Sequence, residues 1–283
     1  LPRRGDLAQE RGTWHRLVNS ITDYTTVYWR LSSSTLVRWS PQGYPLVPHV
    51  AKAWEVSDDH LTYTFHLRDD VTFSDGVRLM SADVKFTYDA IMNPANDTPA
   101  SRSYLSDLEQ CEAVDDLTVR FHMKRPHFEH ALILGDTGII PKHVYGVGDY
   151  NTNPANRAPV GTGPYKFESW ETGQQITLVR NENYWNKDEP AYLDKWVIRC
   201  ISDDNSALQV LLRHDSDAMD FQGEMWNRQA AAPEFAEQFH KIVQDSPVPG
   251  YLSRYNYIGW NLRKPQLADK RVRRALCMLF DRQ

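Results

Sequence analysis

The sequence predicts a mixed α/β (α+β) fold, and three observations carry this prediction. Residues 61–67 and 117–123 alternate apolar and polar side chains with the period of two that a half-buried strand shows. A helix follows Ser81, which we expect to be its N-cap. Between residues 195 and 221, a strand, a helix and a second strand follow one another. That order needs a parallel crossover, so we expect a mixed sheet.

The first half of the chain is expected to form a compact α+β unit, with order beginning near Trp14. Residues 31–37 suit a short helix, and residues 146–159, rich in Asn, Pro and Gly, suit a long loop. Asn93-Pro94 is expected to end the helix that follows Ser81. The inward-facing positions of the alternating strands and of that helix are expected to be Leu61, Tyr63, Phe65, Leu67, Val84, Tyr88, Ile91, Leu117, Val119, Phe121 and Met123.

The run Gly161-Thr162-Gly163-Pro164-Tyr165 joins the two halves. Its two glycines tolerate positive φ at little cost and Pro164 fixes its own φ, so we expect a structural joint here. A phosphate-binding loop is excluded, because no Lys-Ser/Thr pair follows and the third glycine of the dinucleotide fingerprint is absent.

The second half begins with a hairpin of residues 166–170 and 175–180, and the strand–helix–strand order comes next. Ligands favour the carboxyl ends of parallel strands, which points to residues 221–226 as a site. A last helix starts near Val272 and runs off the end at Gln283, so we expect a truncated chain. The start at Leu1 rather than at Met leads us to expect a processed or cut chain, as removal of a secretory signal would produce.

Composition excludes several classes of protein. The formal net charge is −5 and the pI is near 6.1, with no basic stripe, which argues against a nucleic-acid partner. No run of eighteen apolar residues is present. Cys111, Cys200 and Cys277 are far apart, without Cys-x-x-Cys spacing, so we expect no structural zinc and no cofactor. The apolar neighbours of Cys200 and Cys277 make buried free thiols the default, and the odd count leaves open one disulfide with one free thiol, or a partner cysteine outside this sequence.

Several groups of residues that could be catalytic or bind a metal are better interpreted as surface or turn residues. His127 and His130 lack a third ligand and the zincin spacing, so we expect solvated surface histidines rather than a metal site. The acidic pairs at residues 58–59, 115–116 and 203–204 lie in predicted turns, where Asp caps backbone amides. The Gly-x-Ser-x-Gly elbow is absent, which leaves a secreted hydrolase as a minor alternative.

From about Thr35 onward the chain resembles the extracellular solute-binding proteins of family 5, the oligopeptide- and dipeptide-binding group that serves ABC importers. The similar stretches follow one another in the family's order. They are residues 46–59, 63–68, 73–76, 81–86, 140–145, 161–165, 183–185, 193–194 and 269–276.

The resemblance implies a periplasmic-binding-protein-like (type II) architecture. Residues 1–47 would be the first segment of ligand-binding lobe I, residues 48–157 an inserted α+β domain, and residues 158–283 the return segment of lobe I. The second ligand-binding lobe is then expected to be truncated. The family usually has a glycine and an acidic residue before the strand at residues 217–220, whereas this chain has His214-Asp215, so the geometry of that turn is open.

The function that the resemblance implies is binding rather than catalysis. A monomeric, extracytoplasmic component of an ABC importer, periplasmic or a cell-surface lipoprotein, would capture oligopeptides by cleft closure and deliver them to the permease's transmembrane subunits. An oligosaccharide ligand and a ligand-sensing role remain alternatives. Aromatic faces with neutral amides suit such a cleft. The residues expected to bind ligand are Tyr24, Thr25, Thr26, Phe221, Gln222, Trp226, Trp260 and Asn261.

Overall fold

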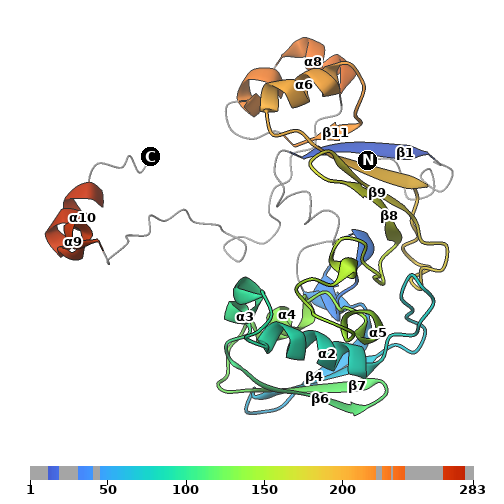
Figure 1. Ribbon diagram of the computed structural model, residues 1–283, viewed down its shortest axis with the longest axis vertical. Helices are drawn as coiled ribbons and strands as arrows, with labels where there is room; N and C mark the ends of the chain where they lie inside the picture. Colours follow the sequence, from blue (N-terminus) through green and yellow to red (C-terminus); the bar gives the residue numbers. More distant parts are fainter. Residues whose placement is uncertain are drawn as a thin grey trace. The chain divides into compact units, whose positions relative to one another are not determined.

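The computed structural model describes residues 12–18, 31–40, 45–220, 225–230, 232–239 and 264–277 (Figure 1). The chain divides into two compact units, residues 1–242 and 243–283, and each is described by itself. In the described residues of the first unit, the strands form a five-stranded mixed sheet, a four-stranded antiparallel sheet and a two-stranded antiparallel ribbon. The predicted α/β class is therefore confirmed.

The mixed sheet has five strands in the order β11-β1-β10-β9-β8. These strands are β1 (Thr13–Val18), β8 (Tyr165–Glu171), β9 (Gln175–Arg180), β10 (Lys195–Cys200) and β11 (Ala218–Met219). β1 runs parallel to both β10 and β11, while β8, β9 and β10 pair antiparallel. The predicted hairpin and the predicted parallel crossover, through α6 (Asp204–Leu212), are both confirmed. β1, which the sequence pattern did not predict as a strand, lies between the two strands of the crossover.

The antiparallel sheet has the strand order β4-β5-β7-β6. Its strands are β4 (Ala51–Val56), β5 (Thr62–Leu67), β6 (Leu108–Asp115) and β7 (Thr118–Met123). The two predicted alternating strands are β5 and β7, which are direct neighbours with Tyr63 opposite Phe121 and Phe65 opposite Val119. All four of these side chains are buried. The predicted inner face is therefore the core face of this sheet.

Helix α2 (Ser81–Met92) packs on the antiparallel sheet, as Figure 1 shows. Val84, Tyr88 and Ile91 are buried, as predicted from their spacing. The prediction that Ser81 is the N-cap is wrong, because the cap is Met80 and Ser81 is the first helical residue. Asp83 explains the difference, since its Oδ2 accepts from Met80 N at 2.9 Å and its Oδ1 from Lys142 N at 2.9 Å. The carboxylate therefore satisfies one helix-end donor and holds a second segment.

The predicted helix at residues 31–37 is largely wrong. Only residues 31–32 of this stretch are helical, and Val37–Trp39 form β2, which pairs antiparallel with β3 (Leu46–Pro48). Leu36 and Val37 are both fully buried although they are neighbours, because the chain is covered from two sides here. An extended segment buried on both sides has no alternating pattern that a sequence could reveal.

The remaining elements are short. In the first unit they are α3 (Pro99–Tyr104), α4 (His130–Gly135), α5 (Lys142–Tyr145), the 3₁₀ turn η2 (Pro154–Asn156), the π-helix η3 (Trp226–Ala230) and α8 (Pro233–Gln238). The predicted loop at residues 146–159 is confirmed, with η2 as its one regular turn. The second unit contains α9 (Pro265–Ala268) and α10 (Lys270–Cys277), where the sequence predicted a helix. Within the described part of the chain, no helix combines the length and apolarity that crossing a membrane requires.

The Gly161–Tyr165 run is a structural joint, though for a different reason than expected. Neither glycine has a positive φ. A Cβ on Gly161 would lie 2.0 Å from the carbonyl oxygen of Ser32, and one on Gly163 would lie 2.4 Å from that of Leu31. Glycine is needed here because two backbones approach closely. The joint is fully buried at Thr162, whose Oγ1 accepts a hydrogen bond from Ser34 N at 3.0 Å.

Candidate functional site

The three parallel strands of the mixed sheet end at one edge. Leu17 of β1 is in register with Met219 of β11, and Val18 of β1 with Cys200 of β10. The carboxyl ends of parallel strands are the usual place for a ligand in a sheet of this kind. We therefore take this carboxyl edge, formed by the ends of β1, β10 and β11, as the candidate site.

The sequence-predicted binding residues follow two of these strand ends. Tyr24, Thr25 and Thr26 come after β1, and Phe221 and Gln222 come directly after β11, but all five lie outside the described residues. Trp260 and Asn261 lie outside them too. Trp226 is the first residue of η3, where the backbone is described and the side chain is not. The strands that precede these residues, β1 and β11, are therefore neighbours in the sheet. The contacts of the predicted binding residues themselves stay predictions.

An ion pair that the sequence analysis did not single out lies at this edge. Arg16 of β1 donates from Nη2 to Oδ2 of Asp220 at 2.7 Å. Asp220 is the residue between β11 and Phe221, and 72% of its side chain is exposed. The pair ties the ends of β1 and β11 together across the sheet. In the sequence, the sign of this ion pair was the position of Asp220 directly before Phe221, a predicted site residue.

The turn that leads into β11 keeps a left-handed backbone without glycine. His214 has a φ of +58°, and its ring stacks on Phe239 with centroids 5.4 Å apart. Three residues further on, the side chain of Asp217 accepts a hydrogen bond from His15 N at 2.6 Å, and the backbone Asp217 N donates to His15 O at 2.8 Å. The open question about this turn is thus answered, because His214 adopts the conformation that glycine would take.

Helix α6 starts directly beyond the end of β10 and is capped by Asp203. The Oδ1 atom of Asp203 accepts from Ser206 N at 2.8 Å and from Ser206 Oγ at 2.6 Å, and these bonds lower the pKa of the carboxyl. Hydrogen bonds from Ser57 and from Leu117 N lower the pKa of Asp59 and of Asp115 in the same way. The prediction that Asp caps backbone amides in these turns is confirmed for one member of each pair.

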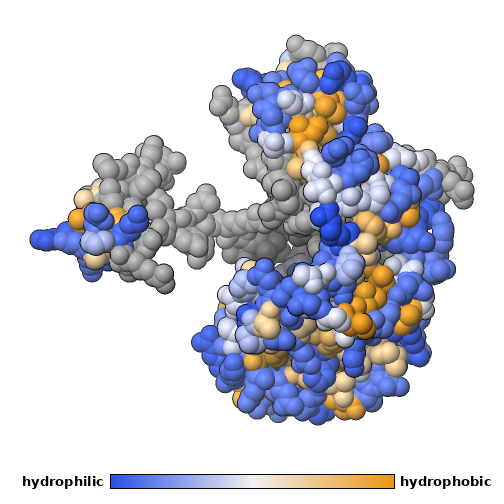
Figure 2. Space-filling view, in the orientation of Figure 1, coloured by the Kyte–Doolittle hydropathy of each residue, from blue (hydrophilic) through white to orange (hydrophobic). Residues whose placement is uncertain are grey.

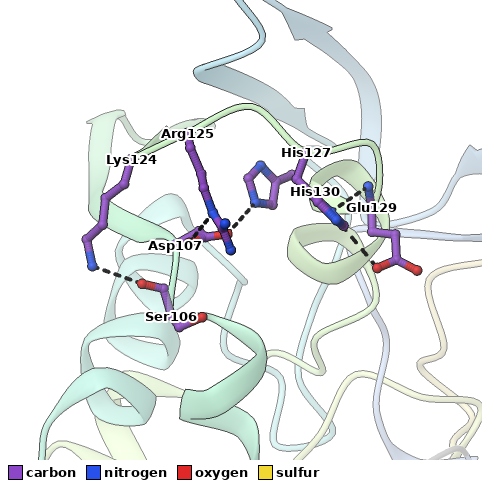
Figure 3. A network of polar contacts seen from close by, with 7 residues as sticks. All are labelled: Ser106, Asp107, Lys124, Arg125, His127, Glu129 and His130. Carbon is purple, nitrogen blue, oxygen red and sulfur yellow. Dashed lines mark hydrogen bonds and ion pairs between the residues drawn. The ribbon is translucent and has the colours of Figure 1, made fainter.

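The histidine pair at the start of α4, His127 and His130, differs from the prediction. His127 is partly exposed, but His130 is 2% exposed, so the expectation of two solvated histidines is wrong for His130. Its Nε2 lies 3.6 Å from Oδ2 of Asp107 (Figure 3). Tyr63 packs edge-on against its ring. Burial lowers the pKa of His130. Across the described ranges, no group of three or more His, Cys, Asp or Glu side chains is placed to hold a metal ion.

A second histidine, His49, is half-buried and lies against Thr35 and Trp185. Its Nδ1 is 3.1 Å from Thr35 O, a distance that assigns the proton to Nδ1. Its ring lies 5.1 Å from that of Trp185, and burial together with the nearby Arg38 guanidinium lowers its pKa to about 4. Trp185 also donates to Thr162 O at 3.1 Å, which connects this cluster to the joint. The environment of His49 is that of a packed interior group.

A cavity of about 530 Å³ lies between α2 and β6, and none of its lining residues belongs to β1, β10 or β11. Its lining includes Lys85, Asp89, Met92, Cys111 and Arg120. Burial raises the pKa of the Cys111 thiol, which keeps it protonated and unreactive. Cys111 and Cys200 are both free, with Cys111 buried as expected and Cys200 half-buried. This cavity therefore offers no activated nucleophile in support of a hydrolase.

Known proteins share both the sequence and the fold. The oligopeptide-binding protein AppA of Bacillus subtilis is 32% identical over 250 residues, which are 83% of this chain and 42% of AppA. A structure of AppA from Bacillus subtilis with a nonapeptide superposes with a TM-score of 0.79 at 28% identity, covering 97% of this chain and 55% of that one. NikZ from Campylobacter jejuni in complex with Ni(L-His) superposes with a TM-score of 0.70 at 28% identity, covering 78% and 45%.

The similarity to these proteins identifies the family of this chain more firmly than its ligand. The chain spans about half the length of the relatives that it matches, and two of them are described with chemically different ligands. The model of the bacterial extracellular solute-binding proteins, family 5 Middle, matches residues 45–283. Together with the mixed sheet and its parallel carboxyl edge, this match means that the chain belongs to the bacterial extracellular solute-binding proteins of family 5.

Proposed function

We propose that this protein is the solute-binding component of an ABC importer, and that it captures oligopeptides and delivers them to the membrane permease. The observation that supports peptide most directly is the AppA structure with its nonapeptide, because that comparison extends over 97% of this chain. The proposal includes an extracytoplasmic location and closure of the protein around its ligand.

In this proposal the carboxyl edge supplies one wall of the binding site. Tyr24, Thr25 and Thr26 would pair with ligand backbone, and Phe221, Gln222, Trp226, Trp260 and Asn261 would provide aromatic area and uncharged hydrogen-bonding groups. The ion pair between Arg16 and Asp220 joins β1 to the end of β11 at this edge. Neutralised charge at the strand ends suits a wall that binds peptides of varied side-chain charge.

The domain organisation is also a proposal. The four-stranded sheet and α2 fall within the segment 48–157 that we assign to the inserted domain, and β8 to β11 fall within the return segment that starts at residue 158. β1 belongs to the first segment, so the mixed sheet is completed by strands from both sides of the insertion. A lobe assembled in this way keeps its ligand wall intact while an extra domain is added.

Native mass spectrometry tests the ligand class. The protein is expressed from its complete gene and purified without refolding, and the masses that it releases on denaturation are measured. Co-purified peptide masses support the proposal. Masses spaced by hexose units would favour the oligosaccharide alternative, and catalytic turnover of either ligand would contradict a binding role.

A further inference from the structure

Strand β6 is an edge of the four-stranded sheet, whose order is β4-β5-β7-β6 (Figure 1). An edge strand has backbone N–H and C=O groups that no neighbouring strand uses. The cavity of about 530 Å³ lies between β6 and α2, and every residue from Leu108 to Val114 lines it. Because successive side chains of a strand point to opposite faces, a cavity lined by all of them runs along the edge of β6.

The two neighbours of Glu112 in β6 direct their backbone groups to this open side. Met123 N of β7 donates to Leu61 O at 2.8 Å, so the backbone of Met123 is directed toward β5. The backbone of Arg120, three residues earlier in β7, is therefore directed toward β6, where Glu112 lies opposite it. Since the backbone groups of successive strand residues point to opposite sides, both neighbours of Glu112 face away from β7.

These neighbours are Cys111 and Ala113. Among the described residues, no backbone group bonds to either of them from the open side. They lie opposite Phe121 and Val119, which are buried, so the side chains of both belong to the core face of the sheet. Cys111 is buried there, but Ala113 is exposed. The apolar layer between the sheet and α2 is thus incomplete beside Ala113, and an apolar side chain added from outside would continue it.

The charge of β6 indicates the chemistry of a partner. The strand has no Lys or Arg, and its acidic residues are Glu109, Glu112 and Asp115. Oε1 of Glu112 accepts from Gln110 Nε2 at 2.8 Å. Its Oε2 lies 4.0 Å from Arg120 Nη1 and 3.5 Å from His122 Nε2, longer than a charge-assisted hydrogen bond, so a cation on the open side can bind it more closely.

The same charge disfavours a second copy of the chain as the occupant. Two β6 strands paired about Glu112 would place like charges opposite each other, which is destabilising. Figure 2 shows hydrophilic and hydrophobic residues interspersed over the part of the molecule around α2 and β6. Recognition at this edge therefore depends on backbone pairing and charge rather than on a broad apolar patch.

We propose that β6 is a docking edge for an extended segment of a partner protein, which pairs with residues 110–113 as an added strand. The segment has an apolar–basic–apolar pattern. Its basic residue lies opposite Glu112, and its apolar residues lie opposite Cys111 and Ala113, toward the cavity beside α2. Irregularities of register on both sides of residues 110–113 limit the pairing to a short segment. This inference does not rest on the proposed function, because none of these residues belongs to the carboxyl edge.

The test uses the protein expressed from its complete gene and two peptides with blocked ends, Thr-Val-Lys-Val-Thr and Thr-Val-Glu-Val-Thr. Hydrogen exchange of residues 108–115 is followed by mass spectrometry at peptide concentrations up to about 1 mM. The lysine peptide is expected to slow this exchange saturably. The glutamate peptide should need an about tenfold higher concentration, because a favourable cross-strand charge pair becomes an unfavourable one.

A charge reversal in the protein should exchange these preferences. Glu112→Lys is expected to bind the glutamate peptide more tightly than the lysine peptide. The matched control is Glu55→Lys, which makes the same change of charge in β4, the opposite edge strand of the sheet. This control should keep the preference of the wild type for the lysine peptide.

Several results would overturn the inference. They are unchanged exchange of residues 108–115 in the wild type at every peptide concentration, equal affinity for the two peptides, and slower exchange confined to other parts of the chain. Exchange at residues 108–115 that slows with the concentration of the protein itself, without peptide, would assign the edge to a second copy and would also overturn it. An oligopeptide that binds without changing exchange at residues 108–115 bears on the proposed function alone.

Discussion

The half-buried His49 should make this protein lose stability at mildly acidic pH. Its pKa is about 4 in the folded protein and 6.5 in an unfolded chain, so the unfolded chain binds the proton more tightly. The stabilising contribution of the neutral ring is complete above pH 6.5 and falls as the pH drops toward about 4, where the folded histidine also becomes protonated. The difference corresponds to about 3 kcal/mol of unfolding free energy.

The contacts of His49 explain the direction of the shift. Burial is the largest cause, and the guanidinium of Arg38 adds a like charge that Glu189 only partly offsets. Arg38 donates to Glu189 through both of its terminal nitrogens, at 2.8 Å for the longer bond. The carboxylate is thereby committed to Arg38, and the bond from His49 to Thr35 O raises the pKa too little to offset burial.

Substitution of His49 by Asn tests this account. The Asn amide nitrogen can replace Nδ1 as donor to Thr35 O, and it does not titrate. Urea unfolding followed by tryptophan fluorescence gives the free energy of unfolding from about pH 8 to about pH 4. The wild type should lose about 3 kcal/mol more than His49→Asn over this range. Equal losses in the two proteins would refute the reasoning, whatever their difference at neutral pH.

Two further predictions concern backbone geometry, and both are checked by urea unfolding. Gly161→Ala should lower the free energy of unfolding by about 3 kcal/mol, because its Cβ would lie 2.0 Å from a backbone carbonyl oxygen. The control is Gly138→Ala, whose Cβ would make only an ordinary contact at 3.6 Å. It should lower the free energy of unfolding by less than about 1 kcal/mol. Equal effects would mean that the joint can relax. His214→Gly should be more stable than His214→Ala by about 1 kcal/mol, because only glycine takes a φ of +58° without strain. An alanine variant as stable as the glycine variant would show that the turn has changed its conformation.

The elements that could be predicted best from the sequence are those whose alternation of apolar and polar residues is visible within a short stretch of chain. β5 and β7 each have one buried face, so their side chains alternate and the period of two is visible. β6 lies beside β7 in the same sheet and was not predicted, because irregularities in register near Leu108 and Ala113 interrupt its alternation. β1 was also not predicted, because its residues are covered unevenly on both faces.

Long-range contacts explain the remaining differences. The reason for glycine at position 161 is the carbonyl of Ser32, which is far away in the sequence. His130 is buried because Tyr63 and Asp107 pack against it, and neither is its sequence neighbour. The candidate site was predicted only by analogy with strand ends, and the parallel register of Leu17 and Met219 is consistent with that placement. The roles of Tyr24 and the other proposed ligand residues stay predictions.

The measurement that tests the central proposal most directly is a calorimetric titration of the protein expressed from its complete gene, after bound ligand has been removed. We expect saturable binding of oligopeptides with a dissociation constant of about 1 μM or tighter. Malto-oligosaccharides at the same concentrations should give no heat of binding, and the peptides should be recovered intact. Saturation by sugars without peptide binding, or cleavage of the peptides, would contradict the account.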